Sequence, residues 1–192
     1  MTELEQYITS CFGMPSHALA QMAALFKPAV LKKGEYFTKR GGVCDKLSFV
    51  RSGLLRVYVA TEDKEVTQWI STKGYFVTDL AALVFEKPAR WTIRALTDVE
   101  LYTISLRDYK RIGDLIPQWH ELEKLFIARC FTMVEDRIFS HLSMTAEERY
   151  DLFFAANKEL FNQVPLQYIA SMLGMTPETF SRIRKKRLSS FS

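Results

Sequence analysis

The sequence predicts an α+β protein in three parts: an N-terminal β barrel of the jelly-roll type, one long helix, and an all-α domain that ends in a helix-turn-helix. Eight short runs rich in aromatic and β-branched residues lie between residues 29 and 106, separated by glycine and charged turns. A helical apolar period then runs from 117 to about 142. Two short helices with a glycine between them are predicted over 166–187. These patterns divide the chain into residues 1–116, 117–143 and 144–192.

The composition is that of a globular protein from a reducing compartment. Hydrophobic residues make up 48% and charged residues 25% of the chain, which excludes a disordered protein. The three cysteines, Cys11, Cys44 and Cys130, are too far apart for a disulfide framework or for a metal or iron–sulfur spacing. No apolar run reaches the length of a membrane span, and the first residues, MTELEQYI, are acidic where a signal peptide would be basic. We therefore expect a cytoplasmic protein that needs no metal or iron–sulfur cofactor and contacts no membrane.

The N-terminal part combines a helical lead-in with the strand-rich region. In residues 2–26, apolar side chains recur at helical spacing on both sides of a Gly-Met-Pro break, so this segment is expected to pack on the domain that follows. Apolar and polar residues alternate over 55–59 and again over 101–104, and TEDKE (61–65) suits a hairpin tip. Many short strands at close spacing are typical of a barrel or jelly roll, which often encloses one small ligand.

The long helix predicted over 117–143 carries two apolar stripes. One stripe can pack against the barrel of the same chain, which leaves the second stripe in need of another partner. The same helix of a second chain would cover it, as a dimer seam. The alternative is a helix that is buried entirely within one subunit. The first stripe comprises Trp119, Leu122, Phe126 and Met133, and the second comprises Ile127, Phe131, Val134, Ile138 and Leu142.

The C-terminal part begins with a capping signal and ends in the two-helix motif. Thr145 and Glu148 form a capping box for a helix to about residue 157. In the motif, Gly174 can adopt the positive φ that ends the first helix, and Thr176 can cap the second. This pattern is typical of a helix-turn-helix, whose second helix enters the major groove of DNA; the alternative is an ordinary helical hairpin with a solvated basic end. Ala170 is expected at the close helix crossing, and the residues expected to point inward are Ile169, Leu173, Met175, Phe180 and Ile183.

Landmarks along the chain resemble the Crp/Fnr family of bacterial transcription regulators, which join a cyclic-nucleotide-binding-type domain to a helix-turn-helix. Three glycine turns carry the likeness in the barrel: KKGEYF at Gly34, VRSGLLRVY at Gly53 and TKGYF at Gly74. RALTDVELYTIS resembles the strand pair that closes the family's barrel, and GMTPETFSRIRKK resembles its recognition helix. The ending is most similar to short regulators of the Bacteroidetes type. The resemblance implies a homodimer that binds double-stranded DNA, with an unknown small-molecule effector and with RNA polymerase as a further partner to consider.

The resemblance places the base-reading side chains on one face of the second helix. Glu178, Ser181 and Arg182 fall where Fnr-like members contact bases. Their chemistry is suitable, because Arg can donate two hydrogen bonds to guanine, Glu can accept one from cytosine, and Ser can serve either. The alternative for each is a solvated surface residue, and for Glu178 a charge that only stabilises the helix end. The residues expected at the DNA backbone are Gln167 and Thr176 near helix ends, with Thr179, Lys185 and Lys186 at phosphates.

The effector region departs from the members of the family that bind cyclic AMP. Where those members have a Gly–Glu pair for the ribose and an Arg–Ser pair for the cyclic phosphate, this chain has Thr78-Asp79 and Ala89-Arg90. Arg90 is one position out of register, which in a strand turns a side chain to the opposite face. We therefore expect weak or no binding of cyclic AMP, and a different effector or none. Arg94 is expected to pair structurally, and the candidate effector pocket comprises Thr78, Asp79, Arg90, Val134 and Glu135.

Two other classes of protein fit parts of the sequence. A cupin-like metalloenzyme would need two or three His ligands inside the barrel, but His17, His120 and His141 all lie outside the strand-rich region. No nucleophile–base pair and no phosphate-binding glycine loop stands out, so we expect no enzymatic activity. The remaining alternative is a ligand-sensing module that acts through a protein partner and has no sequence-specific DNA binding.

Overall fold

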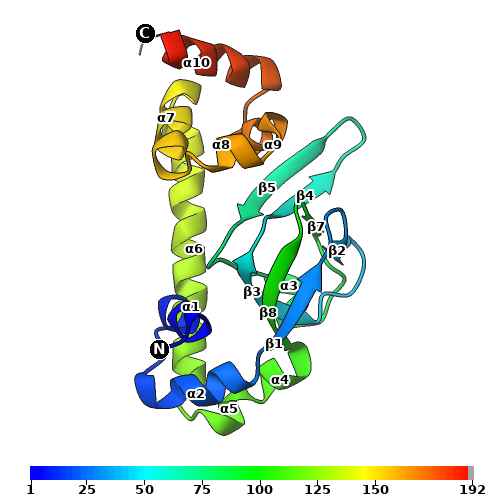
Figure 1. Cartoon of the computed structure of the whole chain (residues 1–192), viewed down its shortest axis with the longest axis vertical. Coiled ribbons are helices and arrows are strands. Elements are labelled where there is room, and N and C mark those ends of the chain that lie inside the picture. Colours follow the sequence, from blue (N-terminus) through cyan, green and yellow to red (C-terminus); the bar gives the residue numbers. More distant parts are fainter. Residues whose placement is uncertain (190–192) are drawn as a thin grey trace. The chain divides into compact units, whose positions relative to one another are not determined.

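Figure 1 shows a computed structural model of the chain, which describes residues 1–189. The chain forms two compact units. The first unit comprises residues 1–59 and 70–131, and the second comprises residues 60–69 together with the chain from Thr132 onward. Residues 190–192, the end of the predicted range 144–192, lie outside the described part. The division into 1–116, 117–143 and 144–192 stays a prediction.

Eight strands form two four-stranded sheets of a β sandwich in the described residues. The strand order is β1-β8-β3-β6 in one sheet and β2-β7-β4-β5 in the other. Each of the eight runs that the sequence predicted contains a strand, which confirms the strand-rich region and the α+β class. The strands are β1 (Lys27–Leu31), β2 (Tyr36–Thr38), β3 (Lys46–Ser52), β4 (Leu55–Ala60), β5 (Glu65–Ser71), β6 (Phe76–Val77), β7 (Thr92–Ala95) and β8 (Val99–Ser105).

Helices pack on the sheet β1-β8-β3-β6 within the first unit. Leu47 and Phe49 of β3 belong to one buried cluster with side chains of α1 (Glu3–Phe12) and α2 (Ser16–Ala24). The ring of Phe12 is central, with its centroid 6.3 Å from that of Phe49 and 4.7 Å from that of Phe126. The expected helical lead-in is therefore confirmed, and its apolar face is part of the main core of this unit.

Gly53 lies in the turn between β3 and β4 and is required by the backbone. Its φ is +87°, a region that L side chains rarely adopt. A Cβ atom at this position would lie 2.2 Å from the carbonyl oxygen of Asp98. The chain can therefore make this close approach only with glycine, which explains one of the landmarks seen in the sequence.

Three short helices and one long helix complete the pattern up to Ser143. Ser105 begins the first helix after the strands, because its hydroxyl accepts a hydrogen bond from the Asp108 N–H at 3.1 Å. Within residues 1–189 no helix is both long and apolar enough to cross a membrane. Over the same residues, His, Cys, Asp and Glu side chains form no group of three suited to a metal ion. The helices are α3 (Leu80–Phe85), α4 (Leu106–Lys110), α5 (Ile112–Leu115) and α6 (Trp119–Ser143).

The second unit is built on an aromatic core between its helices. The predicted capping box is present: Thr145 and Glu148 each accept a hydrogen bond from the backbone N–H of the other. The ring of Tyr150 lies 5.2 Å from Phe180 and 5.6 Å from Phe161, centroid to centroid. The helices are α7 (Ala146–Ala156), α8 (Leu160–Gln163), α9 (Leu166–Met172) and α10 (Pro177–Ser189).

Candidate nucleic-acid interface and effector region

Helices α9 and α10 are joined by the four residues 173–176, and the pair is closed by a buried core. The turn is tight: Gly174 has a φ of +68°, and the Met175 N–H donates to the carbonyl oxygen of Ala170 at 2.9 Å. The imidazole of His141 packs so closely that a Cβ on Gly174 would lie 3.3 Å from it. All six residues that the sequence placed in this core are buried: Ile169, Ala170, Leu173, Met175, Phe180 and Ile183.

The start of α10 is capped as expected. The Thr179 N–H donates to the Thr176 hydroxyl at 3.2 Å, and this bond satisfies one of the free N–H groups of the first turn. Contacts with its own backbone N–H and with the Thr176 hydroxyl lower the pKa of Glu178. Glu178 thus stabilises the positive end of the helix while remaining exposed, and its predicted role in reading bases stays a prediction.

One face of α10 is exposed and carries the polar side chains that the sequence singled out. Positions 181, 182 and 185 come three, four and seven residues after position 178, so these four positions lie along one side of the helix. Arg182 and Lys185 form no ion pair with any residue up to position 189. The exposed members are Glu178, Ser181, Arg182, Lys185 and Lys186 on α10, with Gln167 on α9 and Thr176 in the turn; Thr179 is half-buried.

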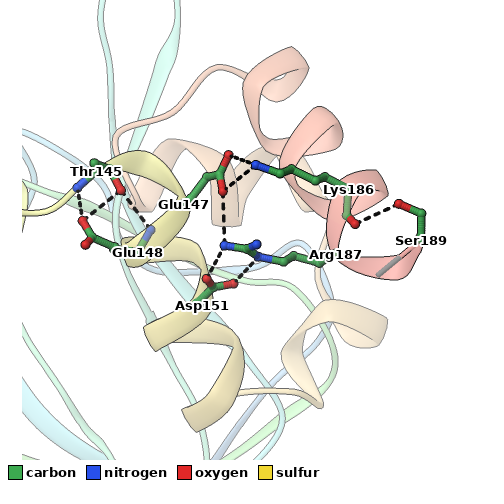
Figure 2. Close-up of polar contacts among 7 residues, drawn as sticks. All are labelled: Thr145, Glu147, Glu148, Asp151, Lys186, Arg187 and Ser189. Carbon is green, nitrogen blue, oxygen red and sulfur yellow. Dashed lines mark hydrogen bonds and ion pairs between the residues drawn. The ribbon is translucent and has the colours of Figure 1, made fainter. Parts of the chain in front are cut away.

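The last turns of α10 are tied to α7 by ion pairs (Figure 2). The ammonium of Lys186 donates to both carboxylate oxygens of Glu147, at 2.9 and 3.1 Å. The guanidinium of Arg187 makes a two-pronged contact with Asp151, at 2.8 and 2.6 Å, and also lies 3.2 Å from Glu147. The hydrogen bond from Lys186 lowers the pKa of Glu147. Lys186 therefore already has a carboxylate partner, and it would have to exchange this partner to contact a phosphate.

In the effector region, the carboxylate of Asp79 is buried and fully engaged. Only 2% of Asp79 is exposed. One oxygen accepts the Ala82 N–H at 3.1 Å and caps α3, while the other accepts the N–H groups of Arg90 and Trp91 at 2.6 and 3.2 Å. The sequence carries a signal for this structural role, because an Asp directly before an apolar helical run is a common N-cap. Its predicted contact with an effector stays a prediction.

Thr78 and Arg90, the neighbours of Asp79 in the predicted effector pocket, do not lie on strands, although the register argument from the sequence treated Arg90 as a strand residue. The segment that holds Arg90 is an irregular loop rather than a strand, and the guanidinium of Arg90 is exposed, 5.8 Å from the ring of Trp91. The Thr78 hydroxyl donates to the carbonyl oxygen of Lys46 at 2.8 Å. Arg94 pairs structurally, as expected, because its Nε donates to the carbonyl oxygen of Gly34 at 2.9 Å.

Helix α6 presents an exposed apolar stripe. Its members range from 40% exposed at Ile127 to 81% at Leu142, so the alternative of a helix buried entirely in one subunit is wrong. Met133 shares the helical face of Trp119 and Phe126 but is 48% exposed, so the expectation that this whole stripe is covered is wrong at Met133. Of the two predicted effector residues on this helix, Glu135 is exposed, and Val134 lines a groove of about 330 Å³ with Arg137, His141 and neighbours. The exposed stripe comprises Ile127, Phe131, Val134, Ile138 and Leu142.

Comparison with known proteins identifies the class to which this architecture belongs. The family described as "Cyclic nucleotide-binding domain" matches residues 28–114 of this chain. FixK2 from Bradyrhizobium japonicum has a TM-score of 0.73 at 16% identity, over 86% of this chain and 85% of that one. The regulator CLP of Xanthomonas campestris, described as c-di-GMP responsive, has a TM-score of 0.65 at 15% identity, over 92% and 93% of the two chains.

A third solved structure is similar to this chain in fold. The catabolite activator protein of Thermus thermophilus has a TM-score of 0.56 at 20% identity, over 93% of this chain and 85% of that one. None of the curated protein sequences compared with the chain matches it. The chain therefore has the fold of the Crp/Fnr regulators: a β sandwich that matches the cyclic nucleotide-binding family, a long helix and C-terminal helices.

Proposed function

We propose that this protein is a homodimeric, cytoplasmic, sequence-specific DNA-binding transcription regulator of the Crp/Fnr type. The observation that carries the proposal is the exposed face of α10. Base-reading and phosphate-binding side chain types share this face, while the opposite face of the helix is buried through Phe180 and Ile183. A helix held this firmly by one side and open on the other suits insertion into a major groove.

Each group of residues has a separate role in the proposed complex. Arg182 reads guanine, and Glu178 and Ser181 contact neighbouring base edges. Contacts with the sugar-phosphate backbone set the register of the helix on the duplex without reading sequence. The exposed stripe of α6 forms the dimer seam, which would set two recognition helices about one helical turn of DNA apart. The backbone contacts come from Gln167, Thr176, Thr179, Lys185 and Lys186.

We infer that cyclic AMP is not the effector. Two observations support this inference. Arg90 is exposed, and the Asp79 carboxylate already accepts three backbone N–H groups, so neither the guanidinium nor the carboxylate is available inside the sandwich for a nucleotide. The candidate effector residues remain Thr78, Asp79, Arg90, Val134 and Glu135. RNA polymerase is a further proposed partner, since a regulator bound beside a promoter can contact it.

The test is selection of bound duplexes from a random DNA pool by the wild-type protein, without effector and then with cyclic AMP, at a fixed salt concentration. We expect a palindromic motif without effector. A motif that requires cyclic AMP would contradict the inference about the effector. If neither condition enriched a motif, the proposal of DNA binding would fail in favour of a ligand-sensing module that acts through a protein partner.

Two single substitutions on α10 should separate base reading from phosphate contact. Arg182→Ala should lose about 1–3 kcal/mol of binding free energy at the selected site and relax the choice of base there. Lys185→Ala should weaken binding to all duplexes similarly. It should also reduce the slope of the logarithm of the binding constant against the logarithm of the salt concentration by about one, which corresponds to one phosphate contact. Fluorescence anisotropy titrations over a series of salt concentrations measure both effects. Full discrimination by Arg182→Ala would contradict our assignment of the reading face.

Removing the carboxylate partner of Lys186 should strengthen DNA binding. In Glu147→Gln the ammonium of Lys186 no longer has to leave an ion pair before it contacts a phosphate. Exposed pairs of this kind contribute about 0.2–1 kcal/mol, so we expect the affinity for every duplex to rise by up to about fivefold. Glu121→Gln is the matched control, because it makes the same charge change in a pair with Lys124 on α6. An equal gain in both variants would indicate net charge alone and would remove Lys186 from the interface.

A further inference from the structure

Two arginines in the second unit hold the carboxyl end of α9. The last carbonyl groups of a helix have no partner within the helix and carry its negative end. Here the carbonyl oxygen of Met172 accepts a hydrogen bond from Arg137 Nη2 at 3.0 Å, and that of Leu173 accepts one from Arg149 Nε at 3.1 Å. Both contacts lie immediately before Gly174, where the turn into α10 begins. These two guanidinium groups therefore contact the backbone directly before that turn.

Arg137 also contacts the hairpin segment 60–69, which belongs to the same unit. Its Nη1 donates to the carbonyl oxygen of Gln68 at 2.5 Å, and its guanidinium lies 5.6 Å from the centre of the Trp69 ring. One planar group thus connects two carbonyl groups far apart in the sequence, and the rigid fork of an arginine fixes the directions of both hydrogen bonds. Burial lowers the pKa of Arg137, so this cation depends on these acceptors for much of its solvation.

A second link joins the hairpin to α9. The N–H of Thr67 donates to the hydroxyl of Ser171 at 2.9 Å, and Thr67 is almost completely buried. The Ser171 hydroxyl in turn lies 3.5 Å from the carbonyl oxygen of Glu65. Arg149 makes no comparable contact: its other hydrogen bond goes to the carbonyl oxygen of Met144 at 2.6 Å, outside the hairpin. The hairpin therefore reaches α9 through Arg137 and Ser171, and Arg149 acts on α9 independently of it.

We propose that Arg137 is a positioning residue that couples the hairpin 60–69 to the turn before α10, so that a displacement of the hairpin shifts the DNA-reading helix. The proposal rests on the function proposed above. Residues 60–69 comprise the end of β4, the connecting turn and most of β5, and the rest of these two strands belongs to the first unit. The whole hairpin lies in the segment that matches the cyclic nucleotide-binding family. A ligand that moved these strands would change the energy of the Arg137 contacts, which is the differential interaction that a regulatory shift requires.

Hydrogen exchange of the free protein tests the coupling without DNA. In Arg137→Gln, the amides of the hairpin and those of residues 173–175 should both exchange faster, by about tenfold, a coupling of ordinary size. Arg149→Gln is the matched control, since it removes the same charge and also frees one α9 carbonyl. It should affect residues 173–175 but leave the hairpin amides, including that of Thr67, unchanged. Unchanged hairpin amides in Arg137→Gln, or equal effects in the two variants, would overturn the proposal.

DNA binding provides the second readout. Arg137→Gln should weaken binding to the selected site by about tenfold, with non-specific binding within about twofold of wild type. Equal weakening on both duplexes would assign Arg137 to folding alone and overturn the positioning role. Arg137→Lys, which keeps the charge, serves if the glutamine variant unfolds, and should fall between it and wild type. A wild-type protein without any specific site would refute the proposed function, while the exchange experiment would still decide the coupling.

Discussion

Phe131→Glu should convert the protein from a dimer into a monomer. Phe131 is 63% exposed in the single chain and lies in the middle of the exposed stripe of α6. In a two-fold seam the substitution places two carboxylates in an apolar contact, one from each subunit. Losses at central interface positions are about 2–4 kcal/mol, so the dimer dissociation constant should rise by a factor of about 30 to 1,000. Sedimentation equilibrium over a range of protein concentrations measures the change.

Met133→Glu is the matched control for this substitution. Met133 is also apolar and is 48% exposed on the same helix, but it lies on the side of α6 opposite the stripe. We expect Met133→Glu to remain a dimer and to keep its affinity for a two-half-site operator, which Phe131→Glu should lose. A wild-type protein that is monomeric at all concentrations, or a dimer that tolerates glutamate at 131, would contradict the assignment of the seam.

Asp79→Ala should lower the free energy of unfolding of the first unit by about 3–4 kcal/mol. The substitution removes the N-cap of α3, a loss of about 1 kcal/mol, and leaves the N–H groups of Arg90 and Trp91 without their acceptor. A buried N–H without a partner costs about 1–3 kcal/mol, and these two are only part-buried, so the lower end of that range applies to each. Urea denaturation followed by circular dichroism gives the difference.

The isosteric variant Asp79→Asn distinguishes this structural role from a simple loss of volume. Its amide oxygen can still accept from one side, but its NH₂ group faces N–H donors on the other, so we expect about half of the loss seen with alanine. Near-wild-type stability of Asp79→Ala would mean that the carboxylate is not needed to hold α3 to the Arg90 loop. In that case Asp79 would become a stronger candidate for the effector contact.

Local patterns in the sequence were sufficient to predict the elements whose contacts form between residues close together in the chain. The core between α9 and α10 was predicted correctly because the helical period, Gly174 and the Thr176 cap all act within one short segment. The capping box at Thr145 and the eight strand runs were predicted for the same reason. The burial expected at Met133 is not found, because periodicity predicts which residues share a face and cannot show how far along α6 the covering side chains extend.

The sequence by itself determined the order of elements, the buried face of α10 and the presence of an apolar stripe on α6. The tertiary structure decided which charges are available for binding. Lys186 meets Glu147 39 positions away, and Arg137 reaches carbonyl groups 69 and 35 positions away. The Asp79 carboxylate likewise accepts N–H groups 11 and 12 residues along the chain. The physical reason is that a charged side chain takes its partner from whatever the fold brings within hydrogen-bond distance, and sequence periodicity carries no record of that distance.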